Sequence, residues 1–220
     1  MKVINELQKS ILTYLEKVSE SEHFYLAGGT ALAEFYLRHR QSNDLDFFTP
    51  EEALIMPFSR QLEKLLRAES MVIDRQRSFQ SFVELLVKSG KQSTIIHLAQ
   101  DSSFRFEELK EFADYPGLKV DSLTDIASNK LLALFSRATL RDFIDIYVIV
   151  KKDLFTTEEL VKKAKIKDPG FDLYWLAVAF ERMKTFKKDA ADMLLLIEPV
   201  NFEDLNSFFD SWRKTIVQDF

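Results

Sequence analysis

The sequence predicts an α+β fold: an N-terminal α/β unit over residues 1–118, followed by an all-helical unit over residues 119–220. Three observations predict it. Strand-like apolar runs occur only in the first half of the chain. The segment Tyr115-Pro116-Gly117 is the clearest break in the sequence. From Ser122 onward, apolar residues recur only at helical spacing.

The N-terminal unit begins with alternating helical and strand patterns. Apolar residues from Val3 to Val18 recur at helical spacing and predict a helix. Phe24–Ala27 is a short apolar run that ends at Gly28-Gly29, as a strand entering a tight turn does. Thr30–Leu37 is then expected to form a short helix, and Leu45–Phe48 a second strand.

The rest of this unit is expected to be mainly β. Thr49-Pro50-Glu51-Glu52 predicts a helix start, with Thr49 as N-cap, proline at the first helical position and Glu52 completing a capping box. Strands are then expected at Met71–Arg77, Phe79–Val87 and Thr94–Ala99, the last two joined by a hairpin turn at 88–91.

The C-terminal unit contains six helical patterns. Thr156-Thr157-Glu158-Glu159 is a capping signature, and Asp168-Pro169-Gly170 ends the helix that it starts. The expected helices span residues 122–137, 139–152, 157–167, 171–186, 188–196 and 201–217.

Composition excludes several classes of protein. With 46% apolar and 30% charged residues the chain is not disordered, and without cysteine it has no disulfide framework or thiolate metal site. No apolar stretch is long enough to span a membrane, and the N-terminus does not resemble a signal peptide, so we expect a cytoplasmic protein with no membrane partner. A net charge of -5 argues against broad nucleic-acid binding, although lysines cluster at 151–167 and 184–188.

Asp44-Leu45-Asp46 is the central motif. Alternate residues of a strand face the same side, so both carboxylates project together and need a cation between them. Mg²⁺ prefers oxygen ligands, and two such ions can clamp the attacking and leaving oxygens of a phosphoryl displacement. The alternative interpretation of an isolated Asp-x-Asp is a pair of solvated acids in a turn.

Gly28-Gly29-Thr30 makes the metal interpretation more specific. Glycines after a strand allow a ligand close to the backbone, and the following helix N-terminus offers N–H groups to phosphate. The alternative is a tight turn that needs positive φ. The order of strand, Gly-Gly turn, short helix and Asp-x-Asp strand would place a phosphate site beside a metal site.

Two further groups of polar residues are candidates. Arg40 and Ser42, close to Asp44, could reach a triphosphate, or the basic residues of segment 38–42 could simply complement a helix dipole. In the helical unit, Lys130 and Arg137 precede a group of charged residues that are neighbours on one helix: Arg141, Asp142 and Asp145. These side chains are expected to form either a solvated stripe or a polar cluster that faces a cleft.

These motifs resemble those of the AbiEii-type nucleotidyltransferase toxin family, which belongs to the type IV toxin–antitoxin systems and to the DNA polymerase β-like nucleotidyltransferase superfamily. Its Gly-Gly-Thr-Ala-Leu block is similar to residues 28–32, and its His-Arg-x-Ser-x-Asp-Leu-Asp-Phe pattern to residues 39–47. Its lysine motif and Arg-Asp-x-x-Asp helix are similar to segments 130–134 and 141–145.

The resemblance implies a polymerase β-like core with a mixed sheet and a helical C-terminal domain. It implies an enzyme that uses NTP and Mg²⁺, with an RNA acceptor such as tRNA and an antitoxin protein as partners. Carried over by position, Gly28, Gly29 and Thr30 would hold the triphosphate, and Asp44 and Asp46 would bind metal. Lys130 would pair with phosphate, Arg141 would contact nucleotide, and Asp142 or Asp145 would complete the site.

One position departs from the superfamily pattern. The strand expected to carry a third carboxylate has His97 there, and Glu84 or Asp101 could substitute for it. His97 could act as a base, because its ordinary pKa is near neutrality, or be structural.

We therefore expect a metal-dependent transfer of a nucleoside monophosphate from NTP to an acceptor hydroxyl, as in the toxin of a toxin–antitoxin pair. The alternative is a catalytically degenerate module of the same fold that binds nucleotide or a partner. A helical nucleic-acid-binding regulator is a third hypothesis, which the acidic composition disfavours.

Overall fold

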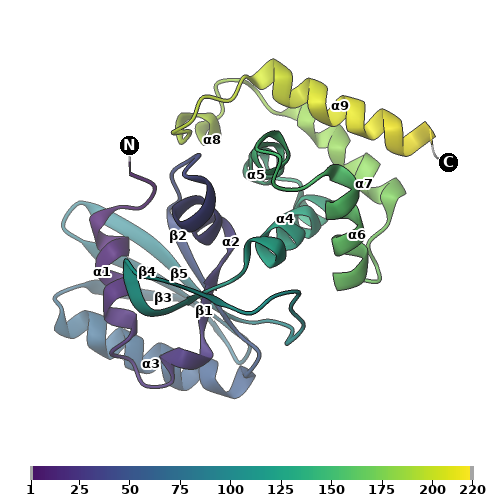
Figure 1. Cartoon of the computed structure of the whole chain (residues 1–220). Helices are drawn as coiled ribbons and strands as arrows, with labels where there is room; N and C mark the ends of the chain where they lie inside the picture. Colours follow the sequence, from purple (N-terminus) through teal and green to yellow (C-terminus); the bar gives the residue numbers. More distant parts are fainter. Residues whose placement is uncertain (1, 219–220) are drawn as a thin grey trace. The chain divides into compact units, whose positions relative to one another are not determined.

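A computed structural model describes residues 2–218. The chain divides into two compact units, Met1–Leu123 and Thr124–Phe220, each of which is described by itself (Figure 1). The expected boundary between residues 118 and 119 lies inside a strand of the first unit, Tyr115–Val120.

The first unit is built on a seven-stranded sheet with the order β3-β4-β5-β2-β1-β7-β6. Pairs β5/β2 and β1/β7 are parallel, and the other four pairs are antiparallel, which confirms the predicted mixed sheet. The strands are β1 Tyr25–Ala27, β2 Asp44–Thr49, β3 Val72–Phe79, β4 Phe82–Ser89, β5 Gln92–Gln100, β6 Lys110–Phe112 and β7 Tyr115–Val120.

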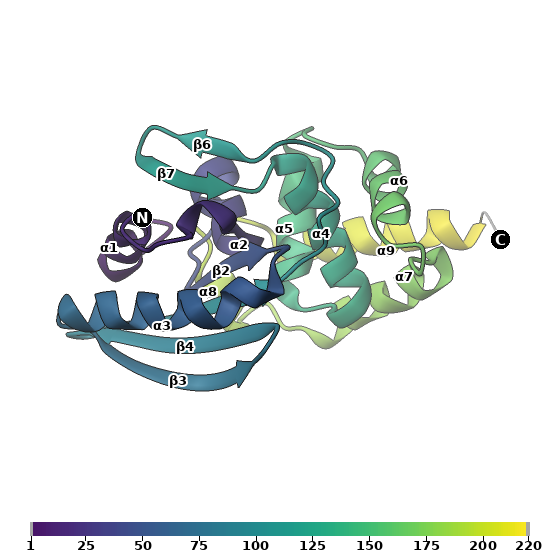
Figure 2. The same ribbon diagram turned by 90° about the horizontal axis from the view of Figure 1, so that it is seen from below.

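Two helices of this unit, α1 (Glu6–Leu15) and α3 (Glu52–Ala68), pack on the sheet, where α3 contacts β2, β3, β4 and β5. Figure 2 shows α3 lying along β3 and β4, with the β6–β7 hairpin at the opposite edge of the sheet. The short α2 (Gly28–Ala31) follows β1 directly and continues into a π-helix, η2 (Leu32–Leu37). A 3₁₀ turn, η1 (Ser21–His23), precedes β1.

The two faces of the central strands differ in burial. In β2, Leu45 and Phe47 are fully buried, whereas the alternating residues Asp44, Asp46 and Phe48 are half-buried. The neighbouring strands β4 and β5 alternate in the same way. One face of the sheet is therefore core, and the other is left accessible to polar side chains.

Two local predictions for this unit are wrong. Helix α3 begins at Glu52, with Glu51 as N-cap, while Thr49 belongs to β2 and its hydroxyl accepts a hydrogen bond from the Glu51 N–H. The sheet therefore takes the residue that we expected to cap the helix.

The Tyr115-Pro116-Gly117 segment is also not a break between units. It lies in β7, which pairs with β1 and β6, and Gly117 has a φ of +75°. The β6–β7 pairing shifts register beside it, and such an irregularity is where a strand tolerates proline.

The second unit is helical, as predicted. Its α6 has the predicted capping box between Thr156 and Glu159. The helix expected over 171–186 is instead α7 followed by the 3₁₀ helix η3, and the one expected over 188–196 is only one turn long. The elements are α4 Leu123–Arg137, α5 Leu140–Lys151, α6 Thr157–Lys167, α7 Leu173–Phe180, η3 Glu181–Thr185, α8 Ala191–Leu194 and α9 Phe202–Gln218.

An aromatic cluster forms the core of the helical unit. The ring of Phe209 on α9 lies 4.7 Å from that of Phe143 on α5 and 5.1 Å from that of Phe180 on α7. Trp212 packs against Phe180 at 5.0 Å. These contacts join α5, α7 and α9 into one packed layer.

Within residues 2–218, no helix is both long enough and apolar enough to cross a membrane.

The stacked pair Phe24 and Phe58 gives a test of the first core. Both rings are buried, with centroids 3.9 Å apart. We expect Phe58→Ala to lower the free energy of unfolding by about 3–5 kcal/mol, because it removes buried area and leaves a cavity. Phe79→Ala is the matched control: its ring is 63% exposed, so its effect should stay within about 0.5 kcal/mol. Urea unfolding followed by circular dichroism measures both, and equal losses would contradict this account of the core.

Candidate functional site

The two carboxylates of β2 lie on the accessible face of the sheet. Because Leu45 and Phe47 are fully buried, the alternation of the strand turns Asp44 and Asp46 to the opposite side. The Asp46 side chain retains 25% of its exposure. Both residues predicted to bind metal therefore share one half-buried face.

The turn after β1 brings a glycine against this pair. Gly28 has a φ of +69°, and Ala27 pairs with Asp46 across β1 and β2. A Cβ atom added at Gly28 would overlap Oδ2 of Asp46 and lie 3.1 Å from its Cγ. Gly28 therefore lies beside the Asp46 carboxylate, as expected if the turn and the Asp-x-Asp strand share one site.

Thr30 and Ser42 hold the turn against β2. Thr30 is fully buried, its hydroxyl donates to the carbonyl oxygen of Asp44, and it is 2.7 Å from the Ser42 hydroxyl. Ser42 is fixed in turn by Gln8, whose side-chain amide donates to its carbonyl oxygen at 3.0 Å. The described contacts of Thr30 and Ser42 therefore lie within the protein and orient the strand that carries the acids.

Arg40 is also buried, with 2% of its surface exposed, and its guanidinium donates to the carbonyl oxygen of Gln41. In this structure it belongs to the packed segment before β2. Direct contact of Arg40, Ser42 or Thr30 with nucleotide stays a prediction, which their burial does not favour.

His97 occupies the position beside Asp46 on the adjacent strand. The strand register pairs Asp46 with His97, and His97 with Glu84. Nδ1 of His97 is 2.8 Å from Oδ1 of Asp46, and Nε2 is 3.3 Å from Oε2 of Glu84. The ring also packs on Phe82, with centroids 5.6 Å apart.

This setting changes the acidity of His97. Its hydrogen bond to Asp46 raises the pKa, burial opposes the rise, and the charges of Asp46, Asp44 and Glu84 add to it. A raised pKa favours the imidazolium, which can donate to both neighbouring carboxylates.

Asp101 lies outside this group. It follows the C-terminal end of β5, where it accepts a hydrogen bond from the Tyr25 hydroxyl at 2.6 Å. Four residues of strand separate it from His97, or about 13 Å. Asp101 therefore does not lie beside Asp46, and its role as a third acid stays a prediction that this position does not favour.

The second constellation lies in the helical unit, where Lys130, Asp142 and Asp145 are buried. Lys130 of α4 is 2.7 Å from Asp145 and 3.5 Å from Asp142, and both acids of α5 are fully buried. Arg137 binds Asp142 with two hydrogen bonds of 2.9 Å, and Thr139 donates a third at 2.6 Å. Of the two interpretations left open, this is a polar cluster rather than a solvated stripe.

Burial and hydrogen bonding oppose each other at Asp142. Burial would raise the pKa of its carboxyl, but the hydrogen bond from Arg137, the charge of Lys130 and the hydrogen bond from Thr139 together lower it. Arg141 points elsewhere: its side chain is 43% exposed, and its Nε is 3.4 Å from Asp192.

Sequence reasoning missed the part played by Thr139. It is the N-cap of α5, yet its hydroxyl goes to Asp142, three residues ahead. The spacing of a threonine and an acid at a helix start was a signal that could have suggested it. It also missed the Asp46–His97–Glu84 alignment, because strand register is set by pairings that spacing alone does not reveal.

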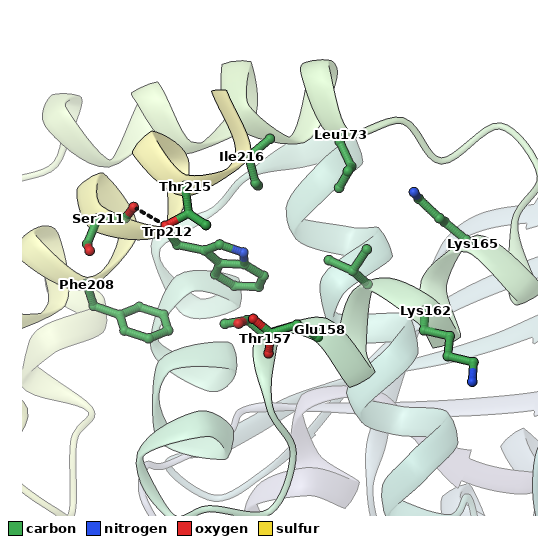
Figure 3. A pocket seen from close by; sticks show the side chains of 11 residues that line it. Thr157, Glu158, Lys162, Lys165, Leu173, Phe208, Ser211, Trp212, Thr215 and Ile216 are labelled. Atoms are coloured by element: carbon green, nitrogen blue, oxygen red, sulfur yellow. Dashed lines mark hydrogen bonds between the residues drawn. The ribbon is translucent and has the colours of Figure 1, made fainter. Parts of the chain in front are cut away.

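Two other features lie apart from these groups. Among the described residues, one group of three has potential ligand atoms that all lie within 4.8 Å of one another: Glu20, Glu22 and His23. Exposed acids commonly cluster in this way without a metal ion. The helical unit has a pocket of about 520 Å³ (Figure 3). It is lined by α6, the start of α7 and α9, with these residues: Thr157, Glu158, Val161, Lys162, Lys165, Leu173, Phe208, Ser211, Trp212, Thr215 and Ile216.

The donors at β2 fit a hard divalent cation. Asp44 and Asp46 offer carboxylate oxygens on one face of β2, beside the Gly28 turn. His97 stands on β5 where we expected a third carboxylate, and its two nitrogens face two acids.

Comparison with known proteins gives similarity over nearly the whole chain. The family model described as "Nucleotidyl transferase AbiEii toxin, Type IV TA system" matches residues 10–120 and 97–214. An uncharacterized protein of Aquifex aeolicus (strain VF5) is 29% identical over 222 residues, covering 95% of each chain.

Two solved structures share the fold. A candidate nucleotidyltransferase from H. pylori is 20% identical with a TM-score of 0.61, over 97% of this chain and 93% of that one. MenT4, a nucleotidyltransferase toxin from Mycobacterium tuberculosis H37Rv, is 16% identical with a TM-score of 0.54, over 97% and 82%.

The contact between Gly28 and Asp46 can be tested with two glycines that both have positive φ. Gly90, at +57°, has open space where a Cβ would stand, so Gly90→Ala should cost only about 1–2 kcal/mol of stability for its backbone conformation. Gly28→Ala should cost about 1–3 kcal/mol more, because its methyl group must displace Asp46. Thermal unfolding of the two variants measures the difference, and equal losses would contradict the contact.

The buried Asp142 predicts a dependence of stability on pH. Because its pKa is lowered in the folded protein, its contribution is present above the unfolded value, near 3.9, and is lost as pH falls below it. The stability difference between the wild type and Asp142→Asn should therefore be largest near neutral pH and narrow below about pH 4. Thermal unfolding from pH 6 to pH 3 measures it. If the stability difference between the wild type and Asp142→Asn stays constant over this range, ionisation of Asp142 adds no stability.

Proposed function

Because the chain belongs to the AbiEii family of nucleotidyltransferase toxins, we propose that it transfers a nucleoside monophosphate from an NTP to an acceptor hydroxyl and releases pyrophosphate. The observation that carries this proposal is the pair Asp44 and Asp46, which share the half-buried face of β2, with Asp46 beside the Gly28 turn. A module that binds a partner without a metal ion has no need of two acids in this position.

We assign Asp44 and Asp46 to a Mg²⁺ ion. When bound, this ion neutralises phosphate charge and orients the reacting oxygens, and positioning with charge neutralisation is the main source of catalysis in this reaction class. Gly28 lies beside the Asp46 carboxylate, and the backbone of the Gly28-Gly29 turn is proposed to hold the triphosphate. A second ion stays a prediction, which His97 in the third position weakens.

The buried cluster of the helical unit is proposed to contribute Lys130 to phosphate binding. Its ammonium now faces Asp145 at 2.7 Å, so a phosphate would have to compete with that carboxylate. Asp142 and Asp145 hold the Lys130 ammonium in place. Nucleotide contact by Arg141 also stays a prediction.

The family suggests the partners. We propose an RNA acceptor such as tRNA and an antitoxin protein that restrains the enzyme. MenT4, which shares the fold, is itself a nucleotidyltransferase toxin.

One observation favours a second candidate, a degenerate module that binds nucleotide or a partner without turnover. His97 stands where the superfamily pattern has an acid that activates the attacking hydroxyl. This candidate predicts metal-dependent nucleotide binding but no transfer with any NTP.

The proposal is tested by incubating the purified protein with Mg²⁺, each radiolabelled NTP in turn and total cellular RNA. We expect label on RNA from the wild type, and a loss of about a hundredfold or more with Asp44→Asn, because the carboxylate supplies charge that the amide does not. Thermal unfolding of the variant should remain close to that of the wild type.

Asp74→Asn is the matched control, because it makes the same change on the same sheet but three strands away from Asp44. In register, Asp44 pairs with Ile95, Ile95 with Leu86, and Leu86 with Asp74 of β3. Its activity should be unchanged. Full activity in Asp44→Asn would refute the assignment. Nucleotide binding without label from any NTP would favour the degenerate module.

A further inference from the structure

Three side chains on three adjacent strands form a continuous polar row. Asp46 of β2 pairs in register with His97 of β5, which pairs with Glu84 of β4. The contacts within the row are 2.8 Å between Asp46 and His97 and 3.3 Å between His97 and Glu84. All three lie on the half-buried face, with side chains 18–25% exposed.

The two carboxylate oxygens of Asp46 have different neighbours. Oδ1 faces Nδ1 of His97, whereas Oδ2 lies against the position that a Cβ of Gly28 would occupy. A terminal carboxylate otherwise rotates broadly about its last side-chain bond. The hydrogen bond from His97 removes that freedom and fixes which oxygen is turned to the Gly28 turn.

The contact of Glu84 within this row is with His97. Glu84 stands two strands from β2, and two strand spacings amount to about 9.5 Å. Its Oε2 is within ion-pair distance of Nε2 of His97. Glu84 therefore reaches Asp46 through the histidine ring, whose two nitrogens lie on opposite sides of that ring.

We propose that His97 and Glu84 are positioning residues: Glu84 orients the His97 ring, and His97 holds Oδ1 of Asp46 so that Oδ2 is presented to a divalent metal ion. This inference rests on the proposed function, because it takes Asp46 as a metal ligand. It assigns to His97 neither metal ligation nor proton transfer. Partners that orient a metal ligand typically change metal affinity by about 10–100-fold when they are removed.

The test separates the two nitrogens of His97 with two amide variants. The Asn side-chain nitrogen stands close to where Nδ1 was, so His97→Asn keeps a donor for Asp46 and loses the contact with Glu84. The longer Gln places its nitrogen near Nε2, so His97→Gln keeps the Glu84 contact and loses the one with Asp46. Both are polar and neutral, which makes them matched controls for each other.

The measurement is the dissociation constant of Mn²⁺ with the full-length protein, read from the electron paramagnetic resonance signal of the free ion. We expect His97→Gln to weaken binding about tenfold, and His97→Asn to stay within about threefold of the wild type. Glu84→Gln should weaken binding less than His97→Gln. In a protein that already carries His97→Asn, Glu84→Gln should not change the Mn²⁺ affinity further, because Glu84 acts only through the His97 ring.

Three outcomes would overturn the inference. Equal Mn²⁺ affinity in the wild type and His97→Gln would remove the positioning role. Equal weakening in His97→Asn and His97→Gln would show that the Asp46 contact is not what matters. A directly coordinated nitrogen in the pulsed Mn²⁺ spectrum of the wild type, lost in His97→Gln, would make His97 a ligand instead.

Failure of this inference can be told apart from failure of the proposed function. If the wild type binds Mn²⁺ and Asp46→Asn does not, the metal site stands, and the His97 variants alone decide the positioning role. If the wild type binds no Mn²⁺, both proposals fall together. Circular dichroism of each variant checks that the sheet is intact.

Discussion

Two negative charges on one face of a strand are the constraint on which the rest of the first unit depends. Asp44 and Asp46 repel each other, and neither can turn into the core that Leu45 and Phe47 fill. Gly28, which lacks a side chain, leaves room for Oδ2 of Asp46, and His97 donates a hydrogen bond to Oδ1. Thr30 and Ser42, buried behind them, fix the strand rather than the ligand.

The helical unit also holds two acids close together, but it pairs them with cationic side chains of its own. Asp142 and Asp145 are fully buried, and a buried carboxylate is costly unless it is paired and hydrogen-bonded. Lys130, Arg137 and Thr139 supply those partners within the protein. The acids of β2 keep exposed surface, which we propose that a metal ion uses, whereas the acids of α5 are paired with Lys130 and Arg137.

This contrast bears on how a nucleotidyltransferase of this family could work. A site that relies on an external ion for its charge balance is inactive until the ion arrives, and its geometry then depends on how well the ligands are held beforehand. His97 has two carboxylate neighbours, so it is better suited to holding a ligand than to serving as one. The departure at this position is therefore compatible with an active enzyme.

The fold and the strand positions of the acids were largely predictable from sequence. Apolar periodicity located the helices and most strands, and the two glycines followed by Asp-x-Asp located the β2 face, because a period of two places alternate side chains together whatever the strand pairs with. Prediction failed at Thr49 and at Tyr115-Pro116-Gly117. In both places, pairing with a distant strand outweighed a strong local signal.

The sequence alone thus determined the residue types and their local spacing: a carboxylate pair on one side of a strand, a turn that needs glycine, and acids three apart on a helix. Tertiary structure decided what each side chain meets. Strand register placed His97 between Asp46 and Glu84, and it placed Asp101 beside Tyr25 at the end of β5. Helix packing buried Asp142 and Asp145 around Lys130. The reason is physical: local spacing fixes direction along one element, whereas contacts depend on register and packing between elements far apart in the chain.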